Sequence, residues 1–481
     1  MKMWSGRFRE PLDPDFDQWQ RSIPFDQALL LEETQASKAH ALALLAAGIL
    51  DPGEQQQIAD ALDAIAARFD PQAADFEPGL LEVSGAEDIH HFVELMLVER
   101  LGTLGFKLHT GRSRNEQIAT DLRLYIRDRA ASLAALLAGW AEQLLLQARA
   151  ADDAVMPSYT HLQRAEPVLV AHWLLAYVEM SLRDVSRLHD AVARLNYCPL
   201  GSGAIAGATL PLDRHIAARA LRFTAPTANS IDATGDRDFV LEYLYTLTLI
   251  GLHASRFAEE MILFATAEFG FVDLPEAFST GSSAMPQKKN PDLAELIRAK
   301  VGRLSAAAHT VTLALKGLPL AYNKDLQETQ EPVFAATRTT QTMLLLLARF
   351  TSAVRFRTAP MRAAAQSGYL NAMAAATYLV HKGLPFRTAH ERVGAAVRLG
   401  LARGCELEQL PLAELQAIAP EFGPDIYDAL TLEATLDCHD VFGGTARTQV
   451  RASLATAEAR VAALLASTRR VTDKDVVHAS P

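Results

Sequence analysis

The amino-acid sequence predicts an all-α fold. Ala, Leu, Arg and Glu dominate its 481 residues, clusters of β-branched residues are few, and long proline-free stretches fill the middle of the chain. The first four residue types are good helix formers. No pattern alternates strands with helices at the period of a β–α–β unit, so a doubly wound sheet is not expected.

The proline-free stretches predict a bundle of about five long helices. Within residues 121–154, apolar residues recur with a period near 3.6, as on one face of a helix. Roughly 34 residues at about 1.5 Å each span about 50 Å, a length typical of an elongated bundle. The other stretches are residues 168–198, 227–274, 292–318 and 333–359.

Prolines divide the rest of the chain into shorter helical patterns on either side of this bundle. We therefore predict three mostly helical domains. They are an N-terminal helical domain at residues 1–111, the central long-helix bundle at residues 112–361, and a C-terminal helical domain at residues 362–481.

One stretch of the bundle is apolar on more than one face. The apolar residues between Tyr243 and Leu252 cover more than a single helical stripe. A helix that is apolar nearly all round is usually buried in a large core. We expect other subunits to complete the bundle, and a self-contained bundle is the alternative.

Bulk properties narrow the class of protein. The net charge of −11, with no basic block, argues against nucleic-acid binding. No apolar run reaches the roughly 18 residues of a membrane span, and the first residues lack the apolar core of a signal peptide. The odd, scattered cysteines Cys198, Cys405 and Cys438 favour a reducing compartment. We expect a cytoplasmic protein that acts on a small molecule.

Three polar segments interrupt the helices. In the first, residues 107–117, Arg112 and Arg114 lie beside Ser113 and Asn115. Two guanidinium groups with neighbouring hydroxyl and amide groups suit a carboxylate ligand. An ordinary helix start, capped by Ser113 or Asn115, explains the segment equally well.

The second polar segment, residues 157–167, is bracketed by two prolines and is expected to be a loop. It offers Thr160, His161 and Gln163. A lone histidine is more often structural than catalytic, but its hydroxyl and amide neighbours make a catalytic role equally plausible.

The third polar segment, residues 279–292, combines Gly281 and two serines with Lys288 and Lys289. Asn290 is expected to cap a helix whose first residue is Pro291. A mobile loop with two lysines beside a helix N-terminus favours an anion. A solvated loop is the plainer alternative.

No cofactor and no metal are expected. Residues 201–207 resemble a dinucleotide-binding loop only loosely, because they lack its spacing and its strand–helix context. Neither a phosphate-binding loop of the Walker type nor a cluster of Cys and His at metal-ligand spacing is present.

The third segment resembles the signature loop of the fumarase/aspartase superfamily, and its ending Gln-Lys-Lys-Asn-Pro-Asp is similar to that of the argininosuccinate lyase family, which includes the lens δ-crystallins. Similar motifs follow one another along nearly the whole chain, at residues 4–8, 110–115, 159–164, 200–207, 322–327 and 443–446.

This resemblance implies three helical domains and a homotetramer around a central bundle of twenty helices, with each active site built from three subunits. It also implies cleavage of argininosuccinate into arginine and fumarate, the last step of arginine biosynthesis, by abstraction of a proton next to a carboxylate. Charge on that carboxylate then needs cationic and dipolar stabilisation.

The resemblance assigns roles to individual residues. It implies Ser282 as the base, Lys288 as the group that stabilises the dianion, and His161, oriented by Glu295, as the acid or proton relay. The substrate-binding residues that it implies are Ser22, Arg114, Asn115, Thr160, Asn290, Tyr322, Gln327 and Gln330.

The chain departs from the family pattern at two positions. Gln330 stands where a lysine is usual, so a neutral amide faces the amino-acid end of the substrate, and Glu116 stands where an aspartate is usual. Gln330 leaves open another superfamily lyase that acts on a different succinyl adduct. A non-catalytic structural paralogue is the other alternative.

Overall fold

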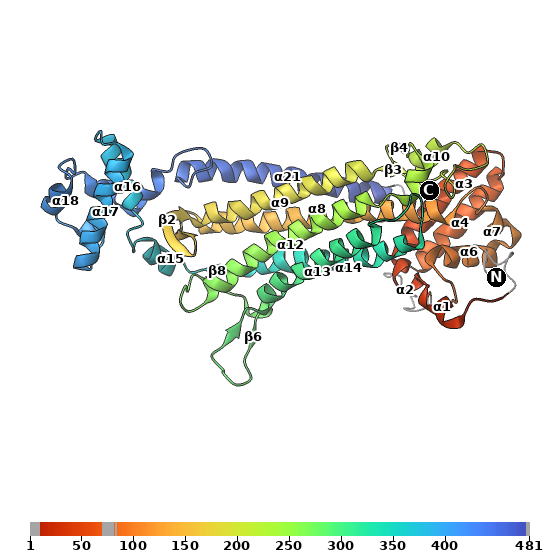
Figure 1. Ribbon diagram of the computed structural model, residues 1–481, viewed down its shortest axis with the longest axis horizontal. Coiled ribbons are helices and arrows are strands. Elements are labelled where there is room, and N and C mark those ends of the chain that lie inside the picture. Colours follow the sequence, from red (N-terminus) through yellow and green to blue (C-terminus); the bar gives the residue numbers. More distant parts are fainter. Residues whose placement is uncertain (1–9, 70–80, 82–83, 478–481) are drawn as a thin grey trace. The chain divides into compact units, whose positions relative to one another are not determined.

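A computed structural model describes the backbone of residues 10–69, 81 and 84–477, and side chains as far as residue 467 (Figure 1). The motif at residues 4–8 lies outside the described residues. The chain divides into two compact units. The first contains residues 1–132, 187–248 and 302–340, and the second contains residues 133–186, 249–301 and 341–481.

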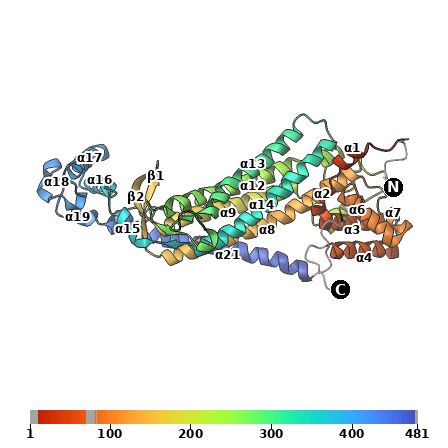
Figure 2. The same cartoon turned by 90° about the horizontal axis from the view of Figure 1, so that it is seen from below.

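Long helices run alongside one another in both views of the molecule (Figures 1 and 2). They are α8 (Arg114–Ala151), α9 (Val170–Leu195), α12 (Asp238–Ala265), α13 (Asp292–Leu315) and α14 (Gln330–Ala353). Each lies within one of the predicted proline-free stretches or overlaps most of it, so the predicted all-α fold and its long-helix bundle are confirmed. The domain boundaries near residues 111 and 361 stay predictions.

Aromatic side chains and buried hydroxyl groups hold the long helices together inside each unit. In the first unit, Tyr125 of α8 packs edge-on against Phe334 of α14, and the hydroxyl of Tyr243 on α12 lies 3.0 Å from that of Thr337. In the second unit, the indole N–H of the fully buried Trp140 donates to the Thr351 hydroxyl at 3.1 Å. These directional contacts fix the rotation of each helix about its axis.

Shorter elements complete the first unit. They are the helices α1 (Pro14–Trp19), α2 (Ile23–Asp26), α3 (Leu30–Ala46), α4 (Pro52–Arg68), α6 (Ile89–Leu101), α7 (Thr103–Lys107), α10 (Arg214–Ala220) and α11 (Ser230–Gly235), the 3₁₀ turns η2 (Gln27–Leu29) and η4 (Lys324–Thr329), and the parallel strands β3 (Tyr197–Cys198) and β4 (Ala225–Pro226).

The second unit adds three antiparallel strand pairs and a C-terminal group of helices. The pairs are β1 (Val155–Thr160) with β2 (Gln163–Leu169), β5 (Val272–Asp273) with β8 (Arg355–Phe356), and β6 (Thr280–Gly281) with β7 (Lys289–Asn290). The helices are α15 (Thr358–Ala365), α16 (Ala372–His381), α17 (Phe386–Arg403), α18 (Leu412–Ile418), α19 (Ile426–Ala429), α20 (Leu432–Asp437) and α21 (Arg447–Val477), with the 3₁₀ turns η3 (Glu276–Phe278) and η5 (Leu407–Gln409).

Helices α16 to α19 pack around their own apolar core, in which Leu379, Ala389 and Ile426 are completely buried. The prediction of shorter helices after the bundle is wrong for α21, which has 31 residues. The described residues contain no helix of the length and apolarity that crossing a membrane requires. Cys198, Cys405 and Cys438 are all free thiols.

Candidate active site

The third polar segment forms a small two-stranded hairpin. Thr280 pairs with Asn290 and Gly281 with Lys289. The carboxylate of Asp292 closes its base by accepting hydrogen bonds from the Thr280 backbone N–H at 2.9 Å and hydroxyl at 2.7 Å. This arrangement holds residues 282–288 out as an exposed loop between two anchored strands.

The prediction that Asn290 caps the following helix is wrong. Its amide lies 3.4 Å from both the Thr280 hydroxyl and the Gly281 carbonyl, so its side chain turns back toward the hairpin. Helix α13 begins at Asp292, and the first helical hydrogen bond runs from the Glu295 N–H to the Pro291 carbonyl. The cause is that residues 289 and 290 are already committed to the strand pair, which leaves the helix to start beyond the proline.

Ser282 lies at the start of the loop, where its oxygen is surrounded by backbone donors. The N–H groups of Ala284 and Met285 donate to its hydroxyl oxygen at 3.3 and 3.1 Å. Donors aimed at an oxygen stabilise negative charge on it, which is what a serine needs to act as a base.

The two lysines of the loop differ. Lys289 is tied down, because its ammonium donates to the Asp273 carboxylate and to the Leu274 carbonyl, both at 2.7 Å. The ammonium of Lys288 makes no hydrogen bond in the described part of the chain, and its side chain is exposed. Of the two cations, Lys288 is therefore the one available to a bound anion.

The second polar segment is a hairpin, so the prediction of a loop there is wrong. Strands β1 and β2 are joined by His161 and Leu162, whose φ values are +55° and +57°. Two consecutive residues with positive φ are typical of the tightest hairpin turn. Pro157 and Pro167 pair with each other, which a sheet of only two strands tolerates because each strand is an edge.

The hairpin exposes the candidate residues His161 and Thr160 at its tip. Within the described chain, no hydrogen bond or ion pair joins His161 to Glu295, the partner that the family pattern implies. Glu295 is itself exposed in the first turn of α13. Both groups are open to a partner outside the chain.

The first polar segment begins α8 as the structural interpretation predicted. The Ser113 hydroxyl accepts from the Asn115 N–H, and the Glu116 carboxylate accepts from the Ser113 N–H at 3.0 Å, so Ser113 caps the start of the helix. The other oxygen of Glu116 accepts from the Gly203 N–H at 2.9 Å. Glu116 therefore links the start of α8 to the backbone of Gly203, within the segment 200–207.

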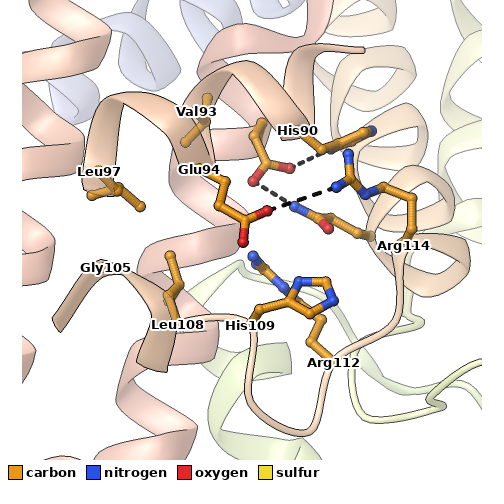
Figure 3. Close-up of a pocket in the computed structure, with 11 residues that line it drawn as sticks. His90, Val93, Glu94, Leu97, Gly105, Leu108, His109, Arg112 and Arg114 are labelled. Carbon is orange, nitrogen blue, oxygen red and sulfur yellow. Dashed lines mark hydrogen bonds and ion pairs between the residues drawn. The ribbon is translucent and has the colours of Figure 1, made fainter. Parts of the chain in front are cut away.

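Arg114 points into a small cavity of the first unit, of about 10 Å³, together with Glu94, His109 and Arg112 (Figure 3). Its guanidinium forms an ion pair with Asp88 and lies 4.0 Å from Glu94. Burial, and then Arg112 and Arg114, lower the pKa of His109 to about 4, which keeps this histidine neutral near pH 7. Two arginines and two glutamates, Glu33 and Glu94, therefore line the cavity.

The remaining first-unit candidates lie near the same charged groups. Ser22 is 5% exposed and hydrogen-bonds the carboxyl group of Asp26. Burial raises the pKa of the Tyr322 hydroxyl. The charge of Arg237 lowers this pKa in part, and the charge of Asp88 raises it. The side-chain amide of Gln327 donates to the Gln20 carbonyl at 3.1 Å.

Asn115 and Gln330 are held differently. The Asn115 amide lies 3.4 Å from the Ala204 carbonyl. Gln330 is the first residue of α14, is 2% exposed, and has a buried amide oxygen with no hydrogen-bond partner among the described residues. That unsatisfied oxygen marks the position where the chain departs from the family pattern.

The predicted residues therefore fall into two groups within one chain. Ser22, Arg114, Asn115, Tyr322, Gln327 and Gln330 belong to the first unit, whereas Thr160, His161, Ser282, Lys288, Asn290 and Glu295 belong to the second.

Sequence reasoning missed a set of buried charged residues in the first unit. Asp88 caps α6 by accepting from the His91 N–H at 2.7 Å, and Asp26 accepts from the Ile89 N–H at 3.1 Å. Burial would raise the pKa of Asp88, but Arg114 and His90 hold it below its ordinary value. Burial and Asp88 raise the pKa of Asp26 to about 7. The one available signal was the density of acidic residues and histidine at residues 87–91.

Comparison with known proteins identifies the family. A lyase family model matches residues 6–305, and a model described as argininosuccinate lyase C-terminal matches residues 369–437. The argininosuccinate lyase of Acidobacterium capsulatum is 68% identical over 471 residues, which are 98% of this chain and 97% of that protein. That of Koribacter versatilis is 55% identical over 96% of this chain and 98% of its own length.

Solved structures agree on the fold. An EDDS lyase variant with bound fumarate, 25% identical, superposes with a TM-score of 0.81 over 97% of this chain and 93% of that chain. A 3-carboxy-cis,cis-muconate lactonizing enzyme from Pseudomonas putida, 20% identical, has a TM-score of 0.72 over 94% of this chain and 100% of its own, and shares the fold alone. The resemblance drawn from the motifs is confirmed, and the chain belongs to the argininosuccinate lyase family of the fumarase/aspartase superfamily.

Proposed function

We propose that this protein cleaves argininosuccinate into arginine and fumarate by β-elimination, as the last step of arginine biosynthesis in the cytoplasm. Curated relatives that are 68% and 55% identical to this chain are named as argininosuccinate lyases. The geometric observation that carries the proposal is the Ser282 oxygen, which accepts two backbone N–H groups in a loop that also presents Lys288.

In the proposed reaction, the deprotonated oxygen of Ser282 takes a proton from the carbon next to a carboxylate. The electron pair of that C–H bond moves onto the carboxylate, which becomes a dianion stabilised by Lys288 and held by Asn290. The pair then forms the double bond of fumarate as the C–N bond breaks. His161, oriented by Glu295, returns a proton to the departing guanidine nitrogen, directly or through a relay.

Substrate binding is proposed to fall to groups around Arg114 in the first unit. The guanidinium of Arg114 can form paired hydrogen bonds with a carboxylate once it turns from Asp88. Gln330 can donate to the carboxylate at the amino-acid end, but without the charge that a lysine would add. The other proposed contacts are Ser22, Asn115, Tyr322 and Gln327 of the same unit, and Thr160 of the second unit.

We further propose a homotetramer in which each active site draws on three subunits. Within one chain, the predicted residues belong to two compact units, and no hydrogen bond or ion pair joins His161 to Glu295 among the described residues. The long helices also expose large apolar side chains, among them Tyr245 at 51%, Leu296 at 56% and Leu313 at 57%. Burying such surfaces against other copies of the chain is a common reason for helices to assemble.

One observation favours a second candidate, a superfamily lyase that acts on a different succinyl adduct. Gln330 replaces the usual lysine and leaves a buried oxygen unsatisfied. A non-catalytic paralogue is disfavoured, because Ser282, His161, Lys288 and Glu295 are all present.

The proposal is tested by following fumarate release from argininosuccinate by ultraviolet absorbance. We expect turnover by the wild type, loss of nearly all of it in Ser282→Ala, and an unchanged fold and oligomer by circular dichroism and light scattering. Ser283→Ala is the matched control in the same loop and should retain activity. No turnover by the wild type would favour the second candidate, and near-normal rates in Ser282→Ala would assign the base to another residue.

A further inference from the structure

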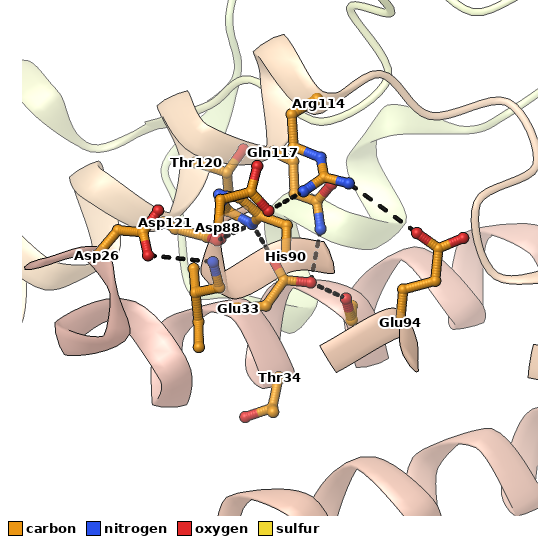
Figure 4. Close-up of polar contacts among 12 residues, drawn as sticks. Asp26, Glu33, Thr34, Asp88, His90, Glu94, Arg114, Gln117, Thr120 and Asp121 are labelled. Carbon is orange, nitrogen blue, oxygen red and sulfur yellow. Dashed lines mark hydrogen bonds and ion pairs between the residues drawn. The ribbon is translucent and has the colours of Figure 1, made fainter. Parts of the chain in front are cut away.

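Three helices of the first unit meet at a cluster of buried ionisable side chains that the proposed reaction does not use (Figure 4). Glu33 lies on α3, His90 on α6 and Asp121 on α8, and their exposed fractions are 1%, 3% and 0%. Ligand-type atoms of the three side chains all lie within 4.8 Å of one another. Because two carboxyl groups and a histidine lie this close together and are this deeply buried, the protonation state of each depends on that of the other two.

Glu33 is surrounded by donors. The Ser37 hydroxyl and the Gln117 amide donate to one of its oxygens at 2.7 and 2.6 Å, and Nδ1 of His90 donates to the other at 2.6 Å. Burial alone would raise the pKa of Glu33, but His90 and Arg112 hold it below its ordinary range. Glu33 is therefore the charged member of the acid pair.

Asp121 has the opposite surroundings. Both of its carboxyl oxygens are buried, and neither accepts a hydrogen bond from the described residues. His90 Nδ1 lies 3.4 Å from Oδ2 but donates to Glu33. An ionised carboxylate without donors is costly to bury. Burial, and then the adjacent Glu33, raise the pKa of Asp121 well above its ordinary value.

A protonated Asp121 would complete the coordination of Glu33. Its side chain is within hydrogen-bonding reach of Glu33. A carboxylate offers about four acceptor positions, and three are filled by Ser37, Gln117 and His90. The O–H of Asp121 would fill the fourth.

A metal ion is the competing occupant of such a cluster. Two ligands bound at about 2.1 Å to one tetrahedral ion lie about 3.4 Å apart. His90 Nδ1 and the Glu33 oxygen are separated by only 2.6 Å, which is a hydrogen-bond distance. The observed spacing therefore favours a proton over an ion.

Two members of the cluster, Glu33 and His90, line the same cavity as Arg114 of the proposed site. His90 follows Asp88 by two residues in the first turn of α6, and Asp88 forms the ion pair with Arg114. Asp121 lies two turns along α8 from Arg114. The cluster therefore connects the N-terminal parts of α6 and α8, near which Asp88 and Arg114 form their ion pair.

We propose that Asp121 is a positioning residue, a buried neutral carboxylic acid that donates its proton to Glu33 and thereby fixes His90, α6 and the Arg114–Asp88 pair. Its effect on turnover rests on the proposed function, whereas its protonation does not.

The first experiment compares three variants for fumarate release and thermal unfolding. Asp121→Asn keeps a donor to Glu33, so it should hold kcat/KM within about threefold of the wild type. Asp121→Leu removes the donor and should lower both kcat/KM, by about tenfold or more, and the unfolding temperature. Glu33→Gln cannot accept four hydrogen bonds and should resemble Asp121→Leu. Asp428→Asn, at an exposed aspartate, is the control.

The second experiment detects the proton directly by infrared spectroscopy. At about pH 9, roughly two units above the pKa of about 7 of Asp26 and Glu32, wild-type protein should still show the C=O band of a protonated carboxyl group. The band should be missing from Asp121→Asn and present in Asp428→Asn. This readout holds even if argininosuccinate is not the substrate.

Three results would overturn the proposal. One is the same infrared band in wild type and Asp121→Asn. Another is a loss of kcat/KM in Asp121→Asn as large as that in Asp121→Leu, which would mean that Asp121 acts as an ionised carboxylate. The third is a metal ion bound stoichiometrically in the wild type, measured by elemental analysis, and lost in Asp121→Asn.

Discussion

Glu32 shows how burial sets the charge of single residues in this protein. It is 3% exposed, and one of its carboxyl oxygens is buried with no hydrogen-bond partner among the described residues. Burial, only partly offset by its backbone hydrogen bond and Arg129, raises its pKa to about 7. Between roughly pH 4.5 and 7, the unfolded chain has lost a proton that the folded chain keeps. The free energy of unfolding therefore falls as pH rises through this window and stays lowered above it.

Glu32→Gln should remove this pH-dependent loss of stability, because an amide does not ionise. At pH 8 the variant should be more stable than the wild type by up to about 3 kcal/mol, from about 1.4 kcal/mol for each pKa unit. At about pH 4.5, where the folded wild type also carries the proton, the two should be nearly equal. Denaturant unfolding at both pH values checks this, with Glu421→Gln at an exposed glutamate as control. An equal gain at both pH values would show that the effect does not come from ionisation.

For individual residues, the sequence suggested candidates from their motifs, but it did not predict which other residues they contact. Ser282 and Lys288 could be proposed because they lie in one short loop whose motif resembles that of the family. Asp88 and Asp121 were missed because they lie on different helices, and their partners Arg114 and Glu33 are set by tertiary packing. The sequence does not distinguish a buried acidic residue from an exposed one, so the protonation state of a buried acid could not be predicted.

Single elements show both the strength and the limit of prediction from periodicity. The long helices were predicted because an apolar period near 3.6 persists over many turns. The hairpin β1–β2 was missed because its turn, His161–Leu162, lacks the Asn and Gly that usually mark a two-residue turn. Pro157 and Pro167 also suggested a loop, although a two-stranded sheet accommodates proline on its edges.

The hairpin turn makes a prediction about Leu162. This side chain is 69% exposed and has φ +57°, a backbone conformation that costs an ordinary residue about 1 kcal/mol or more. Leu162→Gly should relieve that cost and leave stability equal or higher, whereas the β-branched Leu162→Val should lower it. Thermal unfolding of the two variants tests the order. A variant with valine more stable than one with glycine would contradict the positive φ.

For the whole molecule, the apolar surface of the long helices is the feature that a single chain leaves unexplained. Tyr243, Leu247 and Ile250 of α12 are completely buried, while Tyr245 and Leu252 of the same helix are 51% and 45% exposed. The sequence predicted such excess apolar surface from the composition of this helix. It could not predict how copies assemble, because that depends on the matching of surfaces between chains. The proposed tetramer accounts for both the exposed side chains and the division of the site residues into two groups.

The shared site can be tested by mixing two inactive variants. If Ser282 and His161 of one site come from different chains, Ser282→Ala and His161→Ala tetramers should regain activity after they are dissociated and reassembled together. Random assembly would give about a quarter of the sites an intact pair, so about a quarter of the wild-type rate is expected. Each variant treated alone is the control, and light scattering confirms that mixed tetramers have formed. Mixed tetramers with no recovered activity would place both residues of a site on the same chain.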